Sequence, residues 1–452
     1  MKSLISYIQS YIPFYRRNLK IAVPVMLAQL GQGLVQLADT IMVGHAGVTD
    51  LAAAAFGGAV FFIGFGSALG LTMGATPLIG KEYAAGNRPN VVRLFQNSIL
   101  FDMMVCCVLC VLMSAISCFM DKMGQPEDVA TLATTYYRIL LCSLPFVILF
   151  QAFRQFLEGL GNTKLAMYVT IGGNLLNVFL NWIMIFGHFG CPQLGVAGAA
   201  CATLISRVVM CGALVVWVMK NHPFCEYVAE FSTGLFGKTT LKQLYDISWP
   251  IGLQTMMEPL GMNIAVLFVG WCGETALASH EIAINISCFT WMVSCGIASA
   301  TTIRVSHQMG VQDYIAMRKA GIASIHLVLA FMGLCSVLIL LFRHPIAEAF
   351  TTDPEVLSLA PTLLIFLALF QLADGVQTVS IGALRGLQDV KTPVVVAVIC
   401  YIVICLAVGY FCSTILVWGA VGVWVGYLTE LYLAAVILLF AFHKRTKLMI
   451  NH

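Results

Sequence analysis

Long apolar runs alternate with short polar segments along the whole chain. Each run is long enough for a helix that crosses the hydrocarbon core of a membrane, which needs about 20 residues. Gly and Pro mark the two shortest gaps, around Pro192 and around residues 417–418. The pattern predicts twelve spans: 18–43, 51–79, 91–119, 129–157, 163–187, 194–219, 241–271, 277–303, 317–342, 356–384, 391–417 and 418–440.

The second set of six spans repeats the first. Ile-x-x-Pro-x-x-Leu, Val-Gly-x-x-Gly-x-x-x-Leu-Ala and Leu-x-Gly-Leu-x-x-x-Lys each occur once in each half. The motifs begin at residues 21 and 247, 43 and 269, and 157 and 384, an offset of 226 or 227 each time. Because six is an even number of spans, both copies enter the membrane from the same side. We therefore expect parallel repeats related by an axis along the membrane normal.

Lys and Arg predict the orientation of the chain. With the N-terminus in the cytoplasm, most basic residues outside the spans face the cytoplasm, and only Lys122 and Arg343 lie outside the cell. Both termini are therefore expected to be cytoplasmic. The predicted division is an N-terminal segment 1–17, an N-lobe 18–219, a linker 220–240, a C-lobe 241–442 and a tail 443–452.

The first residues carry no small-x-small cleavage site before the first apolar run, so we expect no cleavable signal peptide. Apolar residues at helical spacing predict instead a short helix on the inner membrane surface. These residues are Leu4, Ile5, Ile8, Tyr11 and Ile12.

The composition is 60% hydrophobic and 10% charged, which excludes a soluble domain and predicts an all-α integral membrane protein. Sixteen Cys without a repeated CxxC spacing indicate neither a zinc ribbon nor a disulfide framework. We see no nucleophile–base constellation, phosphate loop or metal-ligand cluster, and the basic residues form no aromatic-interleaved face for nucleic acid. We therefore expect no enzyme, no cofactor beyond a coupling ion, no nucleic-acid partner, and a monomer in the lipid bilayer.

Beyond the outer four residues at each end of the predicted spans, acidic residues outnumber basic ones, and only Arg138 and Arg207 are basic. A charge near the bilayer centre costs about 2.5–3.5 kcal/mol even on the lenient insertion scale. An unpaired carboxylate at that depth binds a proton or a cation, which is the physical basis of coupling to H⁺ or Na⁺. The candidate acids are Asp39, Asp102, Glu258, Glu281, Asp374 and Glu430.

Glu258 and Asp374 both stand in the second half, Glu258 directly before Pro259 and Asp374 before Gly375. Pro259 removes a backbone donor and frees the carbonyl one turn earlier. We interpret the two acids as one shared site, in which two carboxylates and that carbonyl could hold Na⁺. The alternative is that each acid is structural and pairs with another helix.

The first half offers a second candidate cation site. Asp39 ends the first span, Asn177 and Asn181 are one turn apart on the fifth, and Thr203 follows on the sixth. The alternative is that Asn and Thr only hydrogen-bond across spans.

The remaining acids can be interpreted either as functional groups or as structural ones. Asp102 and Glu430 could join a proton relay, or could pair with Arg138, Arg207 or a backbone group. An interfacial position explains Glu281. Aromatic residues could stack on a cationic substrate or simply pack. Candidates for the substrate cleft are Phe370, Gln36, Met257 and Phe289.

These residues resemble the multidrug and toxic compound extrusion (MATE) family, in particular its NorM branch. The matching motifs are Asp39-Thr40-x-Met42-x-Gly44, Met257-Glu258-Pro259, the run Ala278 to Asn285, Gly159-x-Gly161-x-Thr163-Lys164, Ala199-Ala200-x-Ala202-Thr203, and Asp374-Gly375 through Lys391. They are spread over both halves, so the resemblance covers nearly the whole chain.

The resemblance implies a V-shaped pair of six-helix bundles that exports organic cations in exchange for Na⁺ or H⁺. It implies that Glu258 and Asp374 form the second-half cation site, where Phe370 replaces a tyrosine and the hydroxyl ligand is missing. In a related prokaryotic branch, residues matching Asp39, Asn177 and Thr203 form a first-half site. Asn181 replaces a second acid of that pattern.

Our hypothesis is a secondary multidrug antiporter in an inner plasma membrane. A lipid-linked precursor flippase of the wider superfamily would favour basic residues in the cleft, whereas the interior parts of these spans hold more acids than bases. An intramembrane enzyme would need an acid pair or a His cluster at catalytic spacing, and an activity without an ion gradient.

Overall fold

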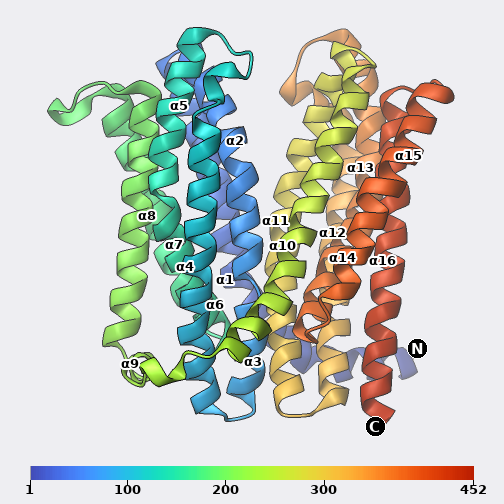
Figure 1. The fold of residues 1–452 in the computed structure, drawn as a ribbon. Coiled ribbons are helices and arrows are strands. Elements are labelled where there is room, and N and C mark those ends of the chain that lie inside the picture. Colours follow the sequence, from blue (N-terminus) through green and yellow to red (C-terminus); the bar gives the residue numbers. More distant parts are fainter. Residues whose placement is uncertain (1, 452) are drawn as a thin grey trace. The chain divides into compact units, whose positions relative to one another are not determined.

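The computed structural model describes the backbone of residues 2–451 and the side chains of residues 9–451, and this part of the chain is helical without a strand (Figure 1). The long helices are α1 (Lys2–Ala46), α2 (Val48–Thr72), α4 (Arg88–Ser117), α5 (Glu127–Cys142), α6 (Leu144–Gly159), α7 (Lys164–Phe186), α8 (Gly195–Lys220), α10 (Lys238–Gly270), α11 (Glu274–Gly310), α12 (Tyr314–Phe350), α13 (Pro354–Gly386) and α16 (Ala420–Asn451). Shorter α-helices are α3 (Ala75–Ala84), α9 (Phe224–Ala229), α14 (Lys391–Ala397) and α15 (Cys405–Tyr410). The 3₁₀ segments are η1 (Met120–Lys122), η2 (His188–Gly190) and η3 (Thr233–Leu235), and the π-helical segments are η4 (Val398–Ile404) and η5 (Phe411–Ile415).

The prediction of an all-α membrane protein is confirmed. Eleven helical stretches among the described residues are long and apolar enough to cross a membrane. The remaining expected span, 241–271, is the 33-residue helix α10, whose polar Gln254, Glu258 and Asn263 make it less apolar. The side chains of Leu4, Ile5 and Ile8, on which the expected surface helix partly rests, lie outside the described residues; the backbone there is part of α1.

Two expected single spans each consist of two helices. The span 51–79 divides into α2 and α3, and 129–157 divides into α5 and α6. Pro77 and Pro145 stand in the first turn of the second helix of each pair. A proline there lacks the N–H that would bond to the last turn of the preceding helix, which favours a break at this point.

The chain divides into two compact units. The N-unit is Leu27–Gly252, and the C-unit combines Met1–Met26 with Leu253–His452. The leucines of the repeated Ile-x-x-Pro-x-x-Leu motif, Leu27 and Leu253, are the first residues after each division. Helices α1 and α10 therefore each contribute residues to both units.

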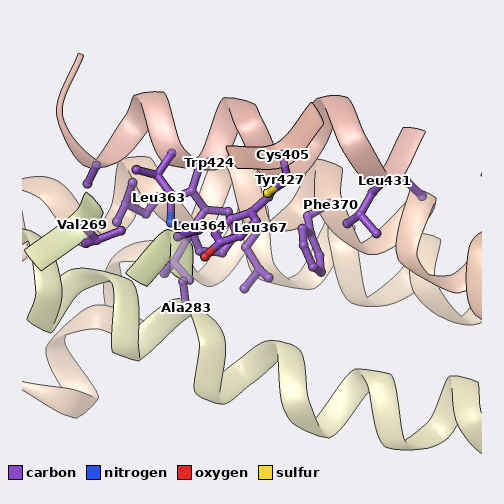
Figure 2. Close-up of a cluster of buried hydrophobic side chains, with 14 of the residues drawn as sticks. Val269, Ala283, Leu363, Leu364, Leu367, Phe370, Cys405, Trp424, Tyr427 and Leu431 are labelled. Atoms are coloured by element: carbon purple, nitrogen blue, oxygen red, sulfur yellow. The ribbon is translucent and has the colours of Figure 1, made fainter. Parts of the chain in front are cut away.

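Each unit has its own buried core. In the N-unit, Phe61, Met113 and Tyr137 are central members of a cluster built from α2, α4, α5 and their neighbours. In the C-unit, Trp424 and Tyr427 of α16 pack among leucines of α13, as Figure 2 shows. Because lipid is as apolar as these side chains, close packing rather than water exclusion holds such helices together.

The duplication is also visible in contacts inside each unit. A Cβ at Gly159 would lie 2.7 Å from Cγ2 of Ile79, and one at Gly386 would lie 2.8 Å from Cβ of Val305. The second pair follows the first by 226 or 227 residues. The same small residue therefore lets the same two helices approach closely in both copies.

Two candidate cation sites

The first candidate site lies in the N-unit, where α1, α7 and α8 bring Asp39, Asn181, Asn177 and Thr203 into one hydrogen-bonded chain. Nδ2 of Asn181 donates to Oδ1 of Asp39 and to Oδ1 of Asn177, 3.2 Å away. Nδ2 of Asn177 donates to Oγ1 of Thr203 at 3.3 Å. The Thr203 hydroxyl donates to the carbonyl of Ala199 at 2.9 Å, so its oxygen is oriented by its own helix.

The helical repeat explains this arrangement. Asn177 and Asn181 are one turn apart and share the face of α7 that meets Asp39 and Thr203. Asn181 is fully buried, and its Oδ1 accepts no hydrogen bond within the described chain. One carboxylate and several neutral oxygens are thus gathered where a proton or a small cation would find acceptors.

Arg207 of α8 lies near this site. Its Nη1 donates to Oγ of Ser143 at 2.7 Å, and its guanidinium carbon lies 5.6 Å and 5.1 Å from the ring centroids of Phe61 and Phe65. The guanidinium also interacts electrostatically with Asp39. Asp39 therefore has a basic neighbour that the sequence analysis did not assign to it.

The second candidate site lies in the C-unit and joins α10, α13 and η4. The Tyr401 hydroxyl donates to the Glu258 carboxylate, and Nε2 of Gln377 donates to the Tyr401 oxygen. Asp374 is hydrogen-bonded by the Thr378 hydroxyl one turn later on α13. Glu258 and Asp374 are close enough to interact electrostatically, so the two predicted acids share one region.

This region has more acid than base. Asp374 is only 2% exposed, and its Oδ2 has no hydrogen-bond partner among the described residues. Gln371, three residues earlier on α13, is fully buried. Neither its Oε1 nor its Nε2 has a hydrogen-bond partner among the described residues. Arg385 interacts with Glu258, but its Nη2 donates to Oε1 of Gln254. A positive ion is therefore the natural complement of the two carboxylates.

The donor set suits a proton or Na⁺ better than a transition metal. Among the side chains described, no three His, Cys, Asp or Glu residues converge in a way that could hold a metal ion. Carboxylate, phenol and amide oxygens, here from Glu258, Asp374, Tyr401 and Gln371, are hard ligands of the kind that Na⁺ takes.

The four substrate-cleft candidates have different surroundings. Phe370 is buried in the C-unit core, with its ring edge-on to Trp424 at a centroid distance of 5.9 Å (Figure 2). Met257 packs against the same core. Gln36 and Phe289 are exposed within the described chain, so only these two present their side chains at a surface.

Sequence reasoning missed Tyr401, Gln377 and Arg385 as members of the second site. Arg385 stands directly after the expected span 356–384, although its guanidinium donates to Gln254. The only sequence signal for Tyr401 is a hydroxyl in an otherwise apolar run.

Comparison with known families gives a direct match. The MatE family model matches the chain twice, at residues 24–183 and 250–411, and the second match starts 226 residues after the first. The two matches together cover most of the chain and coincide with the internal repeat.

Curated relatives match over nearly the full length. The chain is 31% identical over 450 residues to a probable multidrug resistance protein NorM of Mannheimia succiniciproducens, covering 98% of this chain and 96% of the relative. It is 29% identical over 433 residues to the Bacillus subtilis protein of the same name, covering 96% of each chain.

Solved structures share the fold. A MATE transporter in complex with MaD3S superposes with a TM-score of 0.89 at 22% identity, over 97% of both chains. A MOP superfamily transporter from Pyrococcus furiosus superposes with a TM-score of 0.88 at 22% identity, over 96% of both chains.

Proposed function

The chain belongs to the MATE family of multidrug efflux transporters, and from this premise we propose that it exports cationic amphiphilic compounds in exchange for Na⁺ or H⁺. Family membership confirms the resemblance and makes the protein a multi-pass membrane transporter rather than an enzyme. The ion and the residues that bind it are our proposal. The observation that carries it is the buried, incompletely hydrogen-bonded Asp374 carboxylate beside Glu258.

In the proposed mechanism, an entering ion neutralises the pair formed by Glu258 and Asp374. The neutralised site no longer attracts a cationic substrate, which leaves on the side from which the ion came. Exchange works because ion and substrate favour different conformations, so that each shifts the equilibrium that the other uses. Asp39, with Asn177, Asn181 and Thr203, forms a second ion site in the N-unit.

The test is dye efflux from proteoliposomes with Na⁺ and pH gradients imposed separately. Glu258→Gln and Asp374→Asn remove one charge each with little change in shape, and we expect each to reduce ion-driven efflux by about tenfold or more. Glu348→Gln, at an exposed acid near the end of α12, is the matched control. Wild-type rates in both site variants would exclude the proposed role of the pair.

Gln36, Met257, Phe289 and Phe370 remain our proposed contacts for the substrate, and a monomer is our proposed functional unit. We also propose an inner plasma membrane with both termini in the cytoplasm, because Lys and Arg outside the spans favour one side. In a variant that lacks the sixteen native cysteines, labelling of single cysteines placed at residues 3 and 450 by a membrane-impermeant reagent tests the orientation. Labelling in intact cells would contradict it.

A further inference from the structure

Glu430 of α16 is a buried acid that the proposed mechanism does not use. Its side chain is 2% exposed, and Oε2 has no hydrogen-bond partner in the part of the chain that is described. The intramembrane bases considered as its partners, Arg138 and Arg207, belong to the N-unit. An ionised carboxylate in this position would be costly, and a structural acid would be expected to have a complete set of partners.

Close helix packing places Glu430 beside Tyr401. A Cβ at Gly426 would lie 2.8 Å from the carbonyl oxygen of Cys405, and Gly422, one turn earlier, packs on the backbone of Ser413. The contacted residue number falls as the number on α16 rises, so the two segments are antiparallel. Glu430 is one turn after Gly426 on the same face, which brings it level with Tyr401.

Contacts between α16 and α10 indicate the same position for Glu430. The Tyr427 hydroxyl donates to the carbonyl of Met262 at 3.3 Å, and α10 and α16 run in opposite directions (Figure 1). Glu258 stands one turn before Met262, and Glu430 stands one turn after Tyr427, so both acids lie at about the same level. Glu430 accordingly interacts electrostatically with Glu258 and Asp374.

The Tyr401 hydroxyl is suited to connect the two glutamates. Its O–H donates a hydrogen bond to Glu258, and its oxygen accepts one hydrogen bond from Gln377. One acceptor position on the oxygen is left. If a protonated Glu430 donates to that position, its proton can move to the Tyr401 oxygen while the Tyr401 proton moves to Glu258. One O–H bond then breaks and one forms at the tyrosine, and no charge accumulates on it.

We propose that Glu430 is a third acid of the C-unit site, which exchanges a proton with Glu258 through the Tyr401 hydroxyl. The site then carries one more coupling proton than Glu258 and Asp374 alone. The ligand is a proton rather than a metal ion, because the described acids do not converge as metal ligands and the neutral Tyr401 hydroxyl interacts with both Glu430 and Glu258. This inference rests on the proposed function.

Other titratable groups lie near this position. The groups on the elements packed against Glu430 are Tyr401, Cys400 and Cys405 from η4 and α15, Glu258 from α10, Asp374 from α13, and His280 from α11, which stacks on Tyr427.

The test measures the number of protons exchanged per dye molecule. Full-length protein is reconstituted in liposomes with the membrane potential clamped at zero, and the ethidium gradient sustained by a known pH difference is recorded. Each exchanged proton contributes about tenfold to that gradient per pH unit. We expect Glu430→Gln and Tyr401→Phe to lower the sustained gradient by about tenfold per pH unit. Thr429→Val, at the exposed neighbouring position, should keep the wild-type value.

The outcomes separate this inference from the proposed function. A wild-type gradient in Glu430→Gln, together with loss of coupling in Glu258→Gln, overturns the role of Glu430 and leaves the proposed function intact. Wild-type coupling in Glu258→Gln overturns the proposed function itself. A wild-type protein that does not respond to a pH gradient overturns the proton relay.

A measurement on the unmodified protein covers the case in which the variants do not fold. Dicyclohexylcarbodiimide reacts with protonated carboxyl groups in apolar surroundings, and mass spectrometry locates the adduct. We expect an adduct on Glu430 at acidic pH that declines as the pH rises. No adduct at any pH, or an adduct that is independent of pH, would overturn the proposal.

Discussion

Arg207 shows how one side chain can be held by several weak contacts at once. Its hydrogen bond to Ser143 involves a charged donor, and its guanidinium lies over the faces of Phe61 and Phe65. A hydrogen bond to a charged group contributes about 1.5–3 kcal/mol, and a cation–π contact about 0.5–2 kcal/mol. The side chain therefore stabilises the N-unit as well as facing Asp39.

We expect Arg207→Met to lower the free energy of unfolding by about 2–4 kcal/mol, because both kinds of contact are lost while the apolar volume is kept. Thermal unfolding in detergent, followed by tryptophan fluorescence, measures the loss. Arg207→Lys keeps the charge but not the planar group, so it should lie between the wild type and Arg207→Met. Equal stability of Met and Lys variants would argue against a cation–π contribution.

At the scale of residues, helical spacing was enough to group some polar side chains but not others. Asn177 and Asn181 could be grouped because their spacing fixes a common face of one helix. Tyr401 and Gln377 could not be joined to Glu258, because their meeting depends on how closely η4 approaches α10 and α13. Whether either group binds an ion stays a prediction.

At the scale of elements, the linker 220–240 between the two repeats is hydrogen-bonded to side chains of α4. Gln96 donates to the Ser232 carbonyl at 2.9 Å and accepts from the Ser232 N–H at 3.1 Å. Asn97 donates to the Leu235 carbonyl at 3.0 Å and accepts from the Gly237 N–H at 3.3 Å. Two consecutive amide side chains thus replace the partners that an unstructured linker would find in water.

We expect Gln96→Leu to make the linker about tenfold more sensitive to chymotrypsin at Phe231 and Phe236. Two hydrogen bonds of roughly 1 kcal/mol each are lost, which raises the population of the open segment. Gln125→Leu, in an exposed loop before α5, is the control. Unchanged cleavage kinetics in Gln96→Leu would mean that the amide contacts do not hold the linker.

The same segment has a pH-dependent contact. Arg88 pairs with Glu226 at 2.8 Å and with Glu230 at 2.6 Å, and its hydrogen bond to Glu226 lowers the pKa of that carboxyl. A lowered pKa means that the pair stabilises the fold at neutral pH and is lost as the pH falls through the folded-state value. Cleavage of the wild-type linker should therefore accelerate in acid, and Arg88→Gln should remove this acceleration.

Helix α10 offers a matched pair of glycines. A Cβ at Gly261 would lie 2.8 Å from the carbonyl oxygen and 3.1 Å from Cβ of Tyr401, whereas one at Gly270 meets nothing within 4 Å. We expect Gly261→Ala to destabilise the protein by about 1–3 kcal/mol, because α10 must move away from η4. Gly270→Ala should be neutral or slightly stabilising.

Thermal unfolding compares the two variants, and dye efflux shows whether moving α10 also separates Glu258 from Tyr401. Similar stability of the two variants would contradict the close approach of α10 to η4. Normal efflux in a destabilised Gly261→Ala would show that the contact matters only for packing.

Element type was predictable from the sequence, but local irregularities were not. Apolar runs of spanning length predict helices because lipid leaves no other partner for the backbone. The run 391–417 contains two π-helical segments, η4 and η5, and no periodicity of its apolar residues marks them. Both segments pack against α16, and π-helical segments are frequent at functional sites.

At the scale of the whole molecule, the duplication keeps the fold but not the candidate chemistry. The residue 226 positions before Glu258 is Gln32, and the one 226 positions after Asp39 is Ala265. The first candidate site therefore has one carboxylate, which is bonded to Asn181, whereas the second is built on the interacting pair Glu258 and Asp374. Equal architecture with unequal charge predicts that the two units respond differently to Na⁺.

We expect Na⁺, added without substrate, to slow amide hydrogen exchange in α10, α13 and η4 and to leave α7 and α8 unchanged. A hard monovalent cation gains more from two carboxylates than from one that already accepts a hydrogen bond, and binding to the folded state protects the segments it joins. At an Na⁺ concentration 100 times the dissociation constant, the protection corresponds to about 2.7 kcal/mol.

Exchange measured by mass spectrometry in Na⁺ and in choline gives the comparison, and Asp374→Asn is the internal control because it should abolish the difference in the C-unit. Equal protection of α7 would mean that the chain of Asp39, Asn181 and Asn177 binds Na⁺ as well as the acid pair does. A response to pH but not to Na⁺ in either unit would instead assign both sites to protons, since a carboxylate needs no further ligands to take a proton but needs several oxygens to hold Na⁺.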